Sequence, residues 1–302
     1  MARKVEPGAR GPSGWLVIDK PAGMTSAGVV NRVKRLMNMG RRDKAGHAGT
    51  LDPLATGILA VALGEATKVV SHIMDDAKTY TFRVKWGEAR DTDDADGKVT
   101  GHSEVLPEAG QIEALLPQFV GVISQIPPDY SAIKVDGKRA YALARANETL
   151  VLSPRNITVH RFELVESGPD WATFEVNCGK GTYIRALVRD MARELGTLGH
   201  VTVLRRTASG PFDESMANSL DKLESLGHSA ALLEQVLPVQ AALADIPALE
   251  LTENEANCLR HGQTVATPYT GNGLVCAMQG SRLVAMAEAD GVQIRPRRVF
   301  NF

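Results

Sequence analysis

The chain has 302 residues, of which 44% are hydrophobic and 23% charged, a composition typical of a globular protein. Its formal net charge of −1 gives no overall attraction to nucleic acid, and no apolar stretch is long enough to span a bilayer. The three cysteines (178, 258 and 276) are widely spaced and form no CxxC pair, so neither a disulfide framework nor a zinc site is indicated. Because the first residues lack an apolar signal core, we expect a cytoplasmic protein.

The charge is unevenly distributed along the chain. Residues 1–50 carry ten Lys and Arg against three acids, whereas residues 201–250 carry three Lys and Arg against seven acids. Because local potential governs contact with phosphate, this basic front end is compatible with a nucleic-acid partner. A solvated basic surface helix would give the same pattern.

The first half of the chain begins with residues 1–13, whose Gly, Pro and Arg content predicts a mobile arm. A short strand is predicted over 15–19, followed by a helix with Ser26 as its N-cap. The apolar run 55–63 is interpreted as a buried helix. Alternating residues over 79–86 predict a strand. The acidic run 91–97 is not a calcium loop, because its sixth position is Asp96 rather than glycine.

The second half begins with a predicted amphipathic helix over about 112–119. An irregular segment over 126–154 follows, with a short helix near 138–147. Strands are predicted over 157–166, 171–178 and 200–207, with a helix from 184 to about 196 and two short helices within 214–236. A boundary near 240–248 separates a large domain (14–240) from a small unit (248–302) with a helix near 252–261 and three strands. The fold class is α+β, with a large mixed or antiparallel sheet flanked by helices.

The segment from His47 to Gly57, HAGTLDPLATG, carries the clearest chemical signal. It places one carboxylate, Asp52, on a tight loop between a Gly-Thr turn and a proline, where the surroundings can tune its reactivity. Aspartate before proline is also common as a turn or N-cap residue, so the residues alone leave both interpretations open.

Four separated pieces together resemble the signature of bacterial tRNA pseudouridine synthases of the TruB family. They are DKPAGMTS (19–26), the Asp52 loop, KTY (78–80) and GTYIR (181–185) with LRR (204–206) beyond it. The resemblance covers nearly all of residues 14–210. It implies a pseudouridine synthase fold, a catalytic domain over 14–240, and isomerisation of one uridine without cofactor or metal. In that reaction the base detaches from C1′, turns over and reattaches through C5.

The resemblance also assigns a catalytic set of Asp52, Tyr80 and Arg185. A guanidinium beside a carboxylate favours its ionised form, which gives Arg185 a reason to pair with Asp52. Tyr80 would stack on the target base, although a tyrosine on an alternating strand is more commonly a core residue. Leu204 matches an apolar contact to the flipped base.

Further positions match family residues around the RNA. His47 matches the residue that fills the space vacated by the base, Lys20 supports the active-site loop, and Asp94 is an acid near the RNA. Candidates for phosphate contact are Arg205 and Arg206, together with Lys134, Lys138, Arg139 and Arg145 in the segment 127–155.

The small unit (248–302) resembles bacterial relatives through LRHGQ (259–263), and is interpreted as a reduced PUA-like RNA-binding domain. Its RPRR segment (295–298) would hold the acceptor stem by charge. A packing role for this unit is the alternative.

The resemblance thus implies a monomer that acts on the uridine at position 55 in the T-loop of tRNA, after extruding the base. Two alternatives stay open. One is the archaeal and eukaryotic dyskerin-like enzyme that a separate RNA guides, against which Leu54-Ala55 and the small C-terminal domain argue. The other is an RNA-binding or tRNA-folding protein without catalysis.

Overall fold

The computed structural model describes residues 11–131, 134–135, 138–139 and 152–302. Most of the expected N-terminal arm (1–13) lies outside these residues. So does most of the helix expected near 138–147, although Lys138–Arg139 there form a short strand, β9, paired with β8 (Lys134–Val135).

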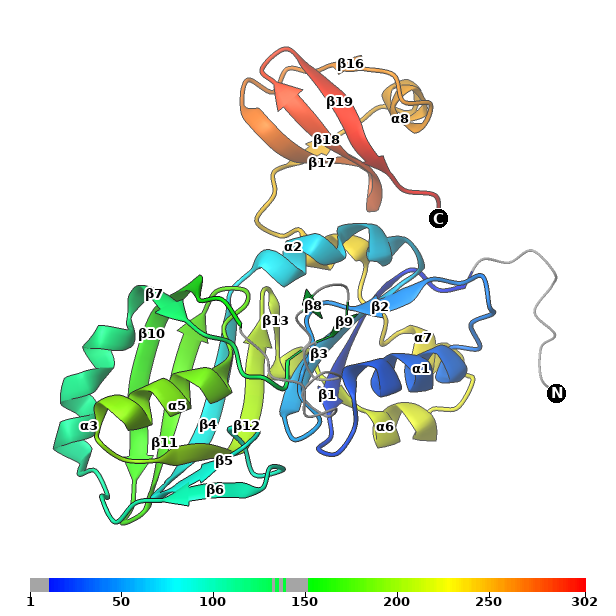
Figure 1. Cartoon of the computed structure of the whole chain (residues 1–302). Helices are drawn as coiled ribbons and strands as arrows, with labels where there is room; N and C mark the ends of the chain where they lie inside the picture. Colours follow the sequence, from blue (N-terminus) through cyan, green and yellow to red (C-terminus); the bar gives the residue numbers. More distant parts are fainter. Residues whose placement is uncertain (1–10, 132–133, 136–137, 140–151) are drawn as a thin grey trace.

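A ten-stranded mixed sheet forms most of the molecule (Figure 1). Its strands follow the order β14-β1-β3-β12-β4-β11-β10-β7, with β13 on β12 and β2 on β3. The pairs β1–β14 and β3–β12 are parallel and the other pairs are antiparallel. The strands are β1 (Gly14–Lys20), β2 (Ala45–His47), β3 (Thr56–Leu63), β4 (Lys78–Trp86), β7 (Gly121–Gln125), β10 (Arg155–Ser167), β11 (Trp171–Cys178), β12 (Gly199–Ser209), β13 (Phe212–Asp213) and β14 (Asn218–Ser219).

The sheet is buried on both faces around β1 and β3. Side chains alternate along β1, so that Leu16 and Ile18 join one core cluster while Trp15 and Val17 join another. The first cluster contains residues of α1 (Ser26–Leu36), α5 (Ile184–Glu194), α6 (Leu220–Ser225) and α7 (Ala230–Leu233). The second contains residues of η1 (Gly64–Val69), α2 (Val70–Asp75) and η4 (Val239–Ala242). The expected α+β class, with a large mixed sheet flanked by helices, is confirmed.

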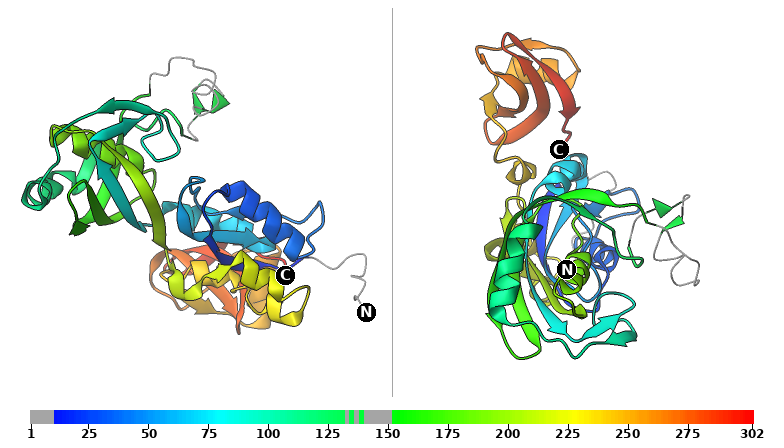
Figure 2. Two further views of the ribbon diagram at one scale, coloured as in Figure 1. Left: turned by 90° about the horizontal axis from the view of Figure 1, so that it is seen from below. Right: turned by 60° about the vertical axis from the view of Figure 1, so that its left-hand side comes forward.

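The remaining elements are distributed around the sheet. Two of them, α3 (Ala109–Leu115) and η2 (Leu116–Phe119), lie beside β10, near the β7 end of the sheet (Figure 2). The hairpin of β5 (Glu88–Arg90) and β6 (Val99–His102) contacts β12, and η3 (Glu214–Met216) directly follows β13. Among the described residues, no helix has the length and apolar content needed to cross a membrane.

Two local expectations were wrong. The run 55–63 forms strand β3 rather than a helix, and it pairs with β1 on one side and β12 on the other. A strand buried on both faces reads as a continuous apolar run, which periodicity cannot distinguish from a buried helix. At α1, Thr25 is the N-cap and accepts a hydrogen bond from the Gly28 N–H (3.0 Å), while Ser26 is buried as the first helical residue.

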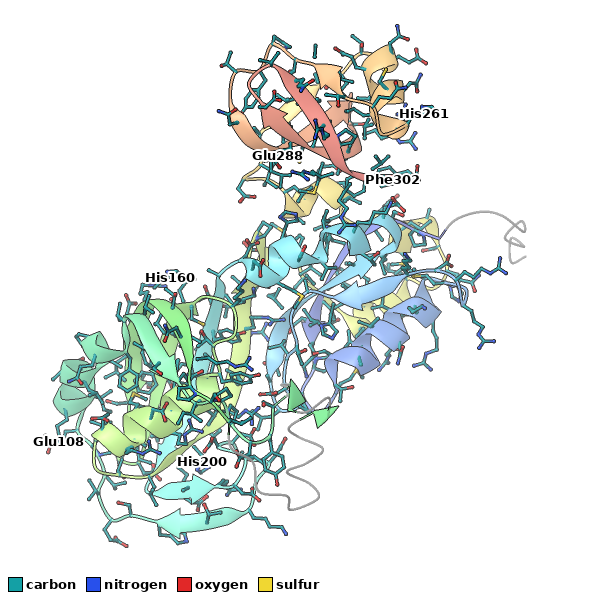
Figure 3. All side chains as sticks on the ribbon, turned by 45° about the horizontal axis from the view of Figure 1, so that its top comes forward. Glu108, His160, His200, His261, Glu288 and Phe302 are labelled. Atoms are coloured by element: carbon teal, nitrogen blue, oxygen red, sulfur yellow. The ribbon has the colours of Figure 1, made fainter. Side chains whose placement is uncertain are left out.

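The C-terminal residues form a five-stranded sheet in the order β15-β17-β18-β19-β16, with one helix. The elements are β15 (Ala248–Glu250), α8 (Glu253–Arg260), β16 (Val265–Ala266), β17 (Asn272–Gln279), β18 (Arg282–Asp290) and β19 (Gln293–Val299). Leu283, Met286 and Phe300 do not belong to this unit's own core. They pack in the buried cluster that contains Trp15. Phe302, labelled in Figure 3, lies on the side that faces the large sheet.

Candidate active site

The loop that carries Asp52 connects β2 to β3, and the segment after β1 anchors it. Ser26 Oγ accepts a hydrogen bond from the Leu51 N–H (2.8 Å) and donates to the Leu51 carbonyl (3.0 Å). The Gly23 N–H donates to the Pro53 carbonyl (2.8 Å). The DKPAGMTS segment therefore fixes the backbone on both sides of Asp52.

Lys20 lies fully buried beneath this loop. Its ammonium donates to the carbonyls of Pro21 (2.9 Å), Met24 (2.7 Å) and Pro53 (3.2 Å). Burial lowers the pKa of Lys20 to about 8, the charge of Asp52 partly offsets this effect, and Arg206 adds to it. With its three donors engaged by backbone, Lys20 shapes the loop rather than reaching solvent.

Asp52 pairs with Arg185, which lies in the first turn of α5. The Arg185 Nε and Nη2 atoms lie 2.9 and 2.8 Å from Asp52 Oδ2. Among the described residues, no donor reaches Oδ1. The Arg185 side chain is 4% exposed whereas that of Asp52 is 35% exposed, so the carboxylate faces outward from a buried cation. This arrangement holds Oδ2 in charge-assisted hydrogen bonds and leaves Oδ1 accessible.

Two other chain segments hold the Arg185 guanidinium. Its Nη1 donates to the Thr92 carbonyl (2.8 Å), and its Nη2 donates to the Tyr130 carbonyl (3.0 Å). Asp94, expected near bound RNA, is buried instead, with Oδ2 at 3.4 Å from Arg185 Nε. Asp94 also accepts hydrogen bonds from Thr92 Oγ1 (2.5 Å) and the Asp96 N–H (3.1 Å). Asp94 therefore stabilises both the position of Arg185 and the turn over residues 92–96.

A cavity of about 550 Å³ opens in front of Asp52, a volume within the range of small-molecule sites. Tyr80 on β4 and Leu204 on β12 line it, with Met74, Tyr183 and Ile184 adding apolar surface. Burial around the Tyr80 hydroxyl raises its pKa, and the neighbouring Arg206 guanidinium opposes that rise. The Tyr80 phenol therefore stays protonated at neutral pH.

Arg205 and Arg206, both expected to contact phosphate, have different surroundings in the structure. Arg205 forms a two-bond ion pair with Asp19 (3.0 and 2.9 Å) and a third contact with Glu214 (2.6 Å). Arg206 is buried and donates to the carbonyls of Ile58 (2.7 Å) and Gly49 (3.1 Å). The expectation of a phosphate contact is therefore not supported for Arg206, which positions the loop around Asp52.

His47 ends strand β2, directly before the Asp52 loop. Its Nδ1 atom is buried and has no hydrogen-bond partner among the described residues. Burial lowers the pKa of His47, and the charge of Arg206 adds to this effect, so the ring is neutral near pH 7. The side chains of Lys134, Lys138, Arg139 and Arg145 lie outside the described residues.

Three residues around Arg185 were missed by sequence reasoning. Asp93 adopts a left-handed conformation (φ 59°) and pairs with Arg189, one turn beyond Arg185 on α5 (3.1 Å). Gln125, at the end of β7, is buried and bonds the backbone of Tyr183. The only sequence signal was the four-residue spacing of the two arginines, which places them on one face of α5.

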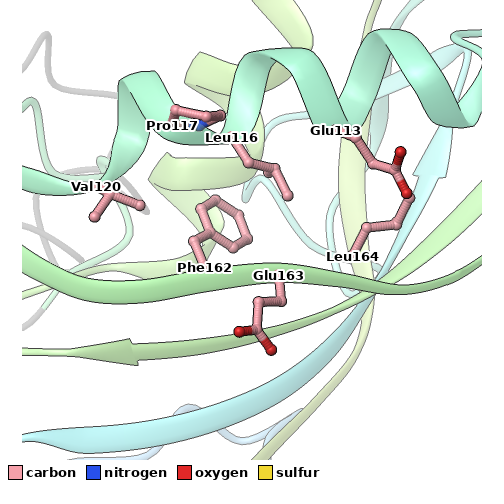
Figure 4. Close-up of a pocket in the computed structure, with 7 residues that line it drawn as sticks. All are labelled: Glu113, Leu116, Pro117, Val120, Phe162, Glu163 and Leu164. Carbon is pink, nitrogen blue, oxygen red and sulfur yellow. The ribbon is translucent and has the colours of Figure 1, made fainter.

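A second hollow of about 550 Å³ lies between η2 and β10 (Figure 4). Leu116, Phe162 and Leu164 give it an apolar floor, while Glu163 points away from it. Because it shares no lining residue with the Asp52 cavity, it is not part of this site.

Comparison with known families identifies the class of enzyme. Residues 34–184 match the family model for the N-terminal domain of TruB family pseudouridylate synthases. Residues 185–244 match the tRNA pseudouridylate synthase B C-terminal domain. The boundary between the two matches falls at Ile184–Arg185, inside α5, and both matches lie before the five-stranded sheet. The class is thus that of the pseudouridylate synthases.

Curated relatives resolve the family. A tRNA pseudouridine synthase B of Rhodospirillum rubrum is 51% identical over 299 residues, covering 95% of this chain and 96% of that protein. The Bradyrhizobium diazoefficiens protein of the same name is 53% identical (95% and 86% covered), and that of Caulobacter vibrioides is 48% identical (95% and 96% covered). The chain belongs to the TruB family, as its motifs indicated.

Solved structures agree with the fold at lower identity. A crystal structure of the archaeal box H/ACA sRNP Nop10–Cbf5 complex superposes with a TM-score of 0.72 at 25% identity, covering 96% of this chain and 86% of that chain. A Cbf5–Nop10–Gar1 complex gives 0.72 at 26% identity, covering 99% and 91%. The expected pseudouridine synthase fold is confirmed, and the much higher identity to the bacterial relatives supports the bacterial type.

Proposed function

We propose that this enzyme isomerises uridine to pseudouridine at position 55 in the T-loop of tRNA, with Asp52 as its catalytic carboxylate. The relatives at about 50% identity carry the name tRNA pseudouridine synthase B, which supports the substrate. The observation that carries the catalytic assignment is the Asp52–Arg185 pair, with its partly exposed carboxylate at the wall of a 550 Å³ cavity.

The reaction breaks one bond and forms another. The C1′–N1 bond of uridine breaks, the uracil turns, and a C1′–C5 bond forms, after which C5 loses a proton and N1 gains one. Asp52 serves as a nucleophile toward the sugar or the base, or as a base at C2′. Each of these routes uses the carboxylate of Asp52, which the buried Arg185 guanidinium orients by binding its Oδ2 atom.

The apolar walls of the cavity serve the freed uracil. Tyr80 stacks on the ring, and Leu204 contacts its other side, so that the base stays in place while it turns. Exclusion of water from this space prevents loss of the base and strengthens the charge interactions.

The target uridine must leave its loop to reach Asp52, and extrusion costs a few kcal/mol. His47, at the end of β2 beside the loop, occupies the space left in the RNA. Lys180 lies at the rim of the cavity in an exposed ion pair with Asp75 (2.9 Å) and contributes a cation for a phosphate. Residues 248–302 bind the acceptor side of the tRNA through Arg295–Arg298. The enzyme acts as a monomer on tRNA in the cytoplasm.

The proposal is tested with an unmodified tRNA transcript and chemical mapping of pseudouridine. Wild type should form one pseudouridine at position 55. Asp52→Asn, which keeps the shape of the side chain but removes its charge, should lose more than about 100-fold in rate while it still binds the transcript. Asp170→Asn, at an exposed turn, is the matched control and should keep the wild-type rate. Binding of the transcript without product by wild type would leave only an RNA-binding role, and an active Asp52→Asn would overturn the catalytic assignment.

A further inference from the structure

The position of Arg185 is not fixed by its own helix. It lies in the first turn of α5, where the helix dipole disfavours a cation, and it is almost completely buried. Its guanidinium is held from outside by the carbonyls of Thr92 and Tyr130. The direction of the group that meets Asp52 therefore depends on where two separate segments, 91–97 and 125–131, lie relative to α5.

Gln125 joins the second segment to the start of α5. Its side-chain amide donates to the Tyr183 carbonyl (3.1 Å) and accepts from the Tyr183 N–H (2.9 Å). Tyr183 is the N-cap of α5 but forms no side-chain capping bond. A side chain must offer both a donor and an acceptor to satisfy the two backbone groups, which an amide does and an ionised carboxylate, having acceptors only, does not. Gln125 thus fixes the backbone two residues before Arg185.

Arg189 joins both segments to the next turn of the same helix. Its Nη1 lies 3.1 Å from Asp93 Oδ2, and its Nη2 donates to the Ile126 carbonyl (2.7 Å). Asp93 neighbours Thr92, whose carbonyl holds Arg185, and its left-handed backbone is a conformation that non-glycine residues rarely adopt. Arg189 therefore holds in place the two loops that present carbonyls to Arg185.

We propose that Gln125 and Arg189 are positioning residues that direct the Arg185 guanidinium onto Asp52, and that they control the rate of isomerisation rather than the affinity for RNA. This inference rests on the proposed function. Neither side chain lines the cavity, so neither touches the substrate base. Their effect passes through the geometry of the Asp52–Arg185 pair, where a displacement of about 1 Å is enough to cost about 100-fold in rate.

The test compares four variants under single-turnover conditions, with enzyme in excess over tRNA. Gln125→Glu keeps the acceptor but places a second oxygen against the Tyr183 carbonyl. Arg189→Gln removes the ion pair, and Arg189→Lys keeps the charge but cannot span Asp93 and the Ile126 carbonyl together. Arg193→Gln changes an exposed arginine one turn further along α5 and serves as the matched control. The dissociation constant for tRNA and the thermal midpoint are measured for each variant.

We expect Gln125→Glu and Arg189→Gln to lower the single-turnover rate constant by about 10- to 100-fold, with the dissociation constant unchanged within about twofold. Arg189→Lys should be faster than Arg189→Gln but slower than wild type, and Arg193→Gln should keep the wild-type rate. If Arg189→Gln does not fold, Arg189→Lys carries the test alone, and a wild-type rate for it overturns the role of Arg189. A folded Gln125→Glu or Arg189→Gln with the wild-type rate, or with a loss confined to binding, also overturns the inference. Absence of pseudouridine from wild type would instead overturn the proposed function.

Discussion

The carboxyl group of Asp93 is largely buried, and burial disfavours its ionised form. Burial raises the pKa of Asp93 from 3.8 to about 6, while the guanidinium groups of Arg189 and Arg185 oppose the rise and Asp190 adds to it. The folded protein therefore binds a proton at Asp93 more tightly than the unfolded chain does. By linkage, the contribution of Asp93 to stability is fully present below about pH 4 and is lost as the pH rises to about 6.

Asp93→Asn should remove this pH dependence. Asparagine tolerates the left-handed backbone at this position, so the turn should keep its shape. We expect the stability of wild type minus that of Asp93→Asn to fall by up to about 3 kcal/mol between about pH 4 and pH 6, and to be constant above that range. Urea unfolding of both proteins across this range measures the difference. A difference that stays constant from pH 4 to pH 7 would contradict the raised pKa.

At the scale of single residues, the sequence motifs predict the Asp52–Arg185 pair but not all of the residues that surround it. Asp52 and Arg185 are 133 positions apart, and the structure joins them by hydrogen bonds. Arg205 and Arg206 were grouped by adjacency, yet neighbouring residues on a strand point to opposite faces, and only Arg206 is buried. Gln125 carries no local signal and Arg189 only its four-residue spacing from Arg185, because the Tyr183 backbone, the Ile126 carbonyl and the Asp93 carboxylate reach them only through the tertiary fold.

At the scale of elements, alternation predicted β4 and β11 nearly to their ends, because each of these strands alternates between two different environments. Strand β3 was missed because both of its faces are buried and its residues show no such contrast. Its neighbour β12 is bonded to β3 only at Arg205–Thr56 and Arg206–Gly57. Because β3 and β12 are far apart in the sequence, their pairing leaves no periodic pattern in the residues of either strand.

Gly57 is required where β3 meets β12. A Cβ atom on Gly57 would lie 2.2 Å from the Arg206 carbonyl oxygen, and the residue has a φ of +96°. Gly57→Ala should therefore push β12 away and strain the backbone, with a loss of about 3 kcal/mol in the free energy of unfolding. Denaturant unfolding measures this loss.

The matched control is Gly46→Ala on β2, where an added Cβ meets nothing within 4 Å and φ is not positive. Its stability should stay within about 0.5 kcal/mol of wild type. Equal losses in the free energy of unfolding for the two variants would show that contact with β12 is not the reason for glycine at position 57.

At the scale of the whole molecule, the five-stranded sheet is attached to the large sheet by shared core and by backbone contacts. Met286 and Phe300 lie in the same buried cluster as Trp15 and Ile58. The Lys68 ammonium on η1 donates to the Val299 carbonyl (2.7 Å), and the Glu65 carboxylate accepts from the Asn301 N–H (2.8 Å). The sequence predicts a boundary near 240–248, but it does not predict this shared core, because the members of the core are distributed from residue 15 to residue 300.

Because the two sheets share a core, we expect the chain to unfold in one cooperative transition, and Phe300→Ala to lower the midpoint of that whole transition. Phe300 is 3% exposed, and truncating a buried phenylalanine costs about 3–5 kcal/mol. Differential scanning calorimetry distinguishes a shift of the single peak from the appearance of a second one. Val292→Ala, at a residue 71% exposed, is the control and should leave the peak in place. A separate low-temperature peak in Phe300→Ala, with the main peak unmoved, would show that the C-terminal sheet folds independently and that the shared cluster does not couple the two sheets.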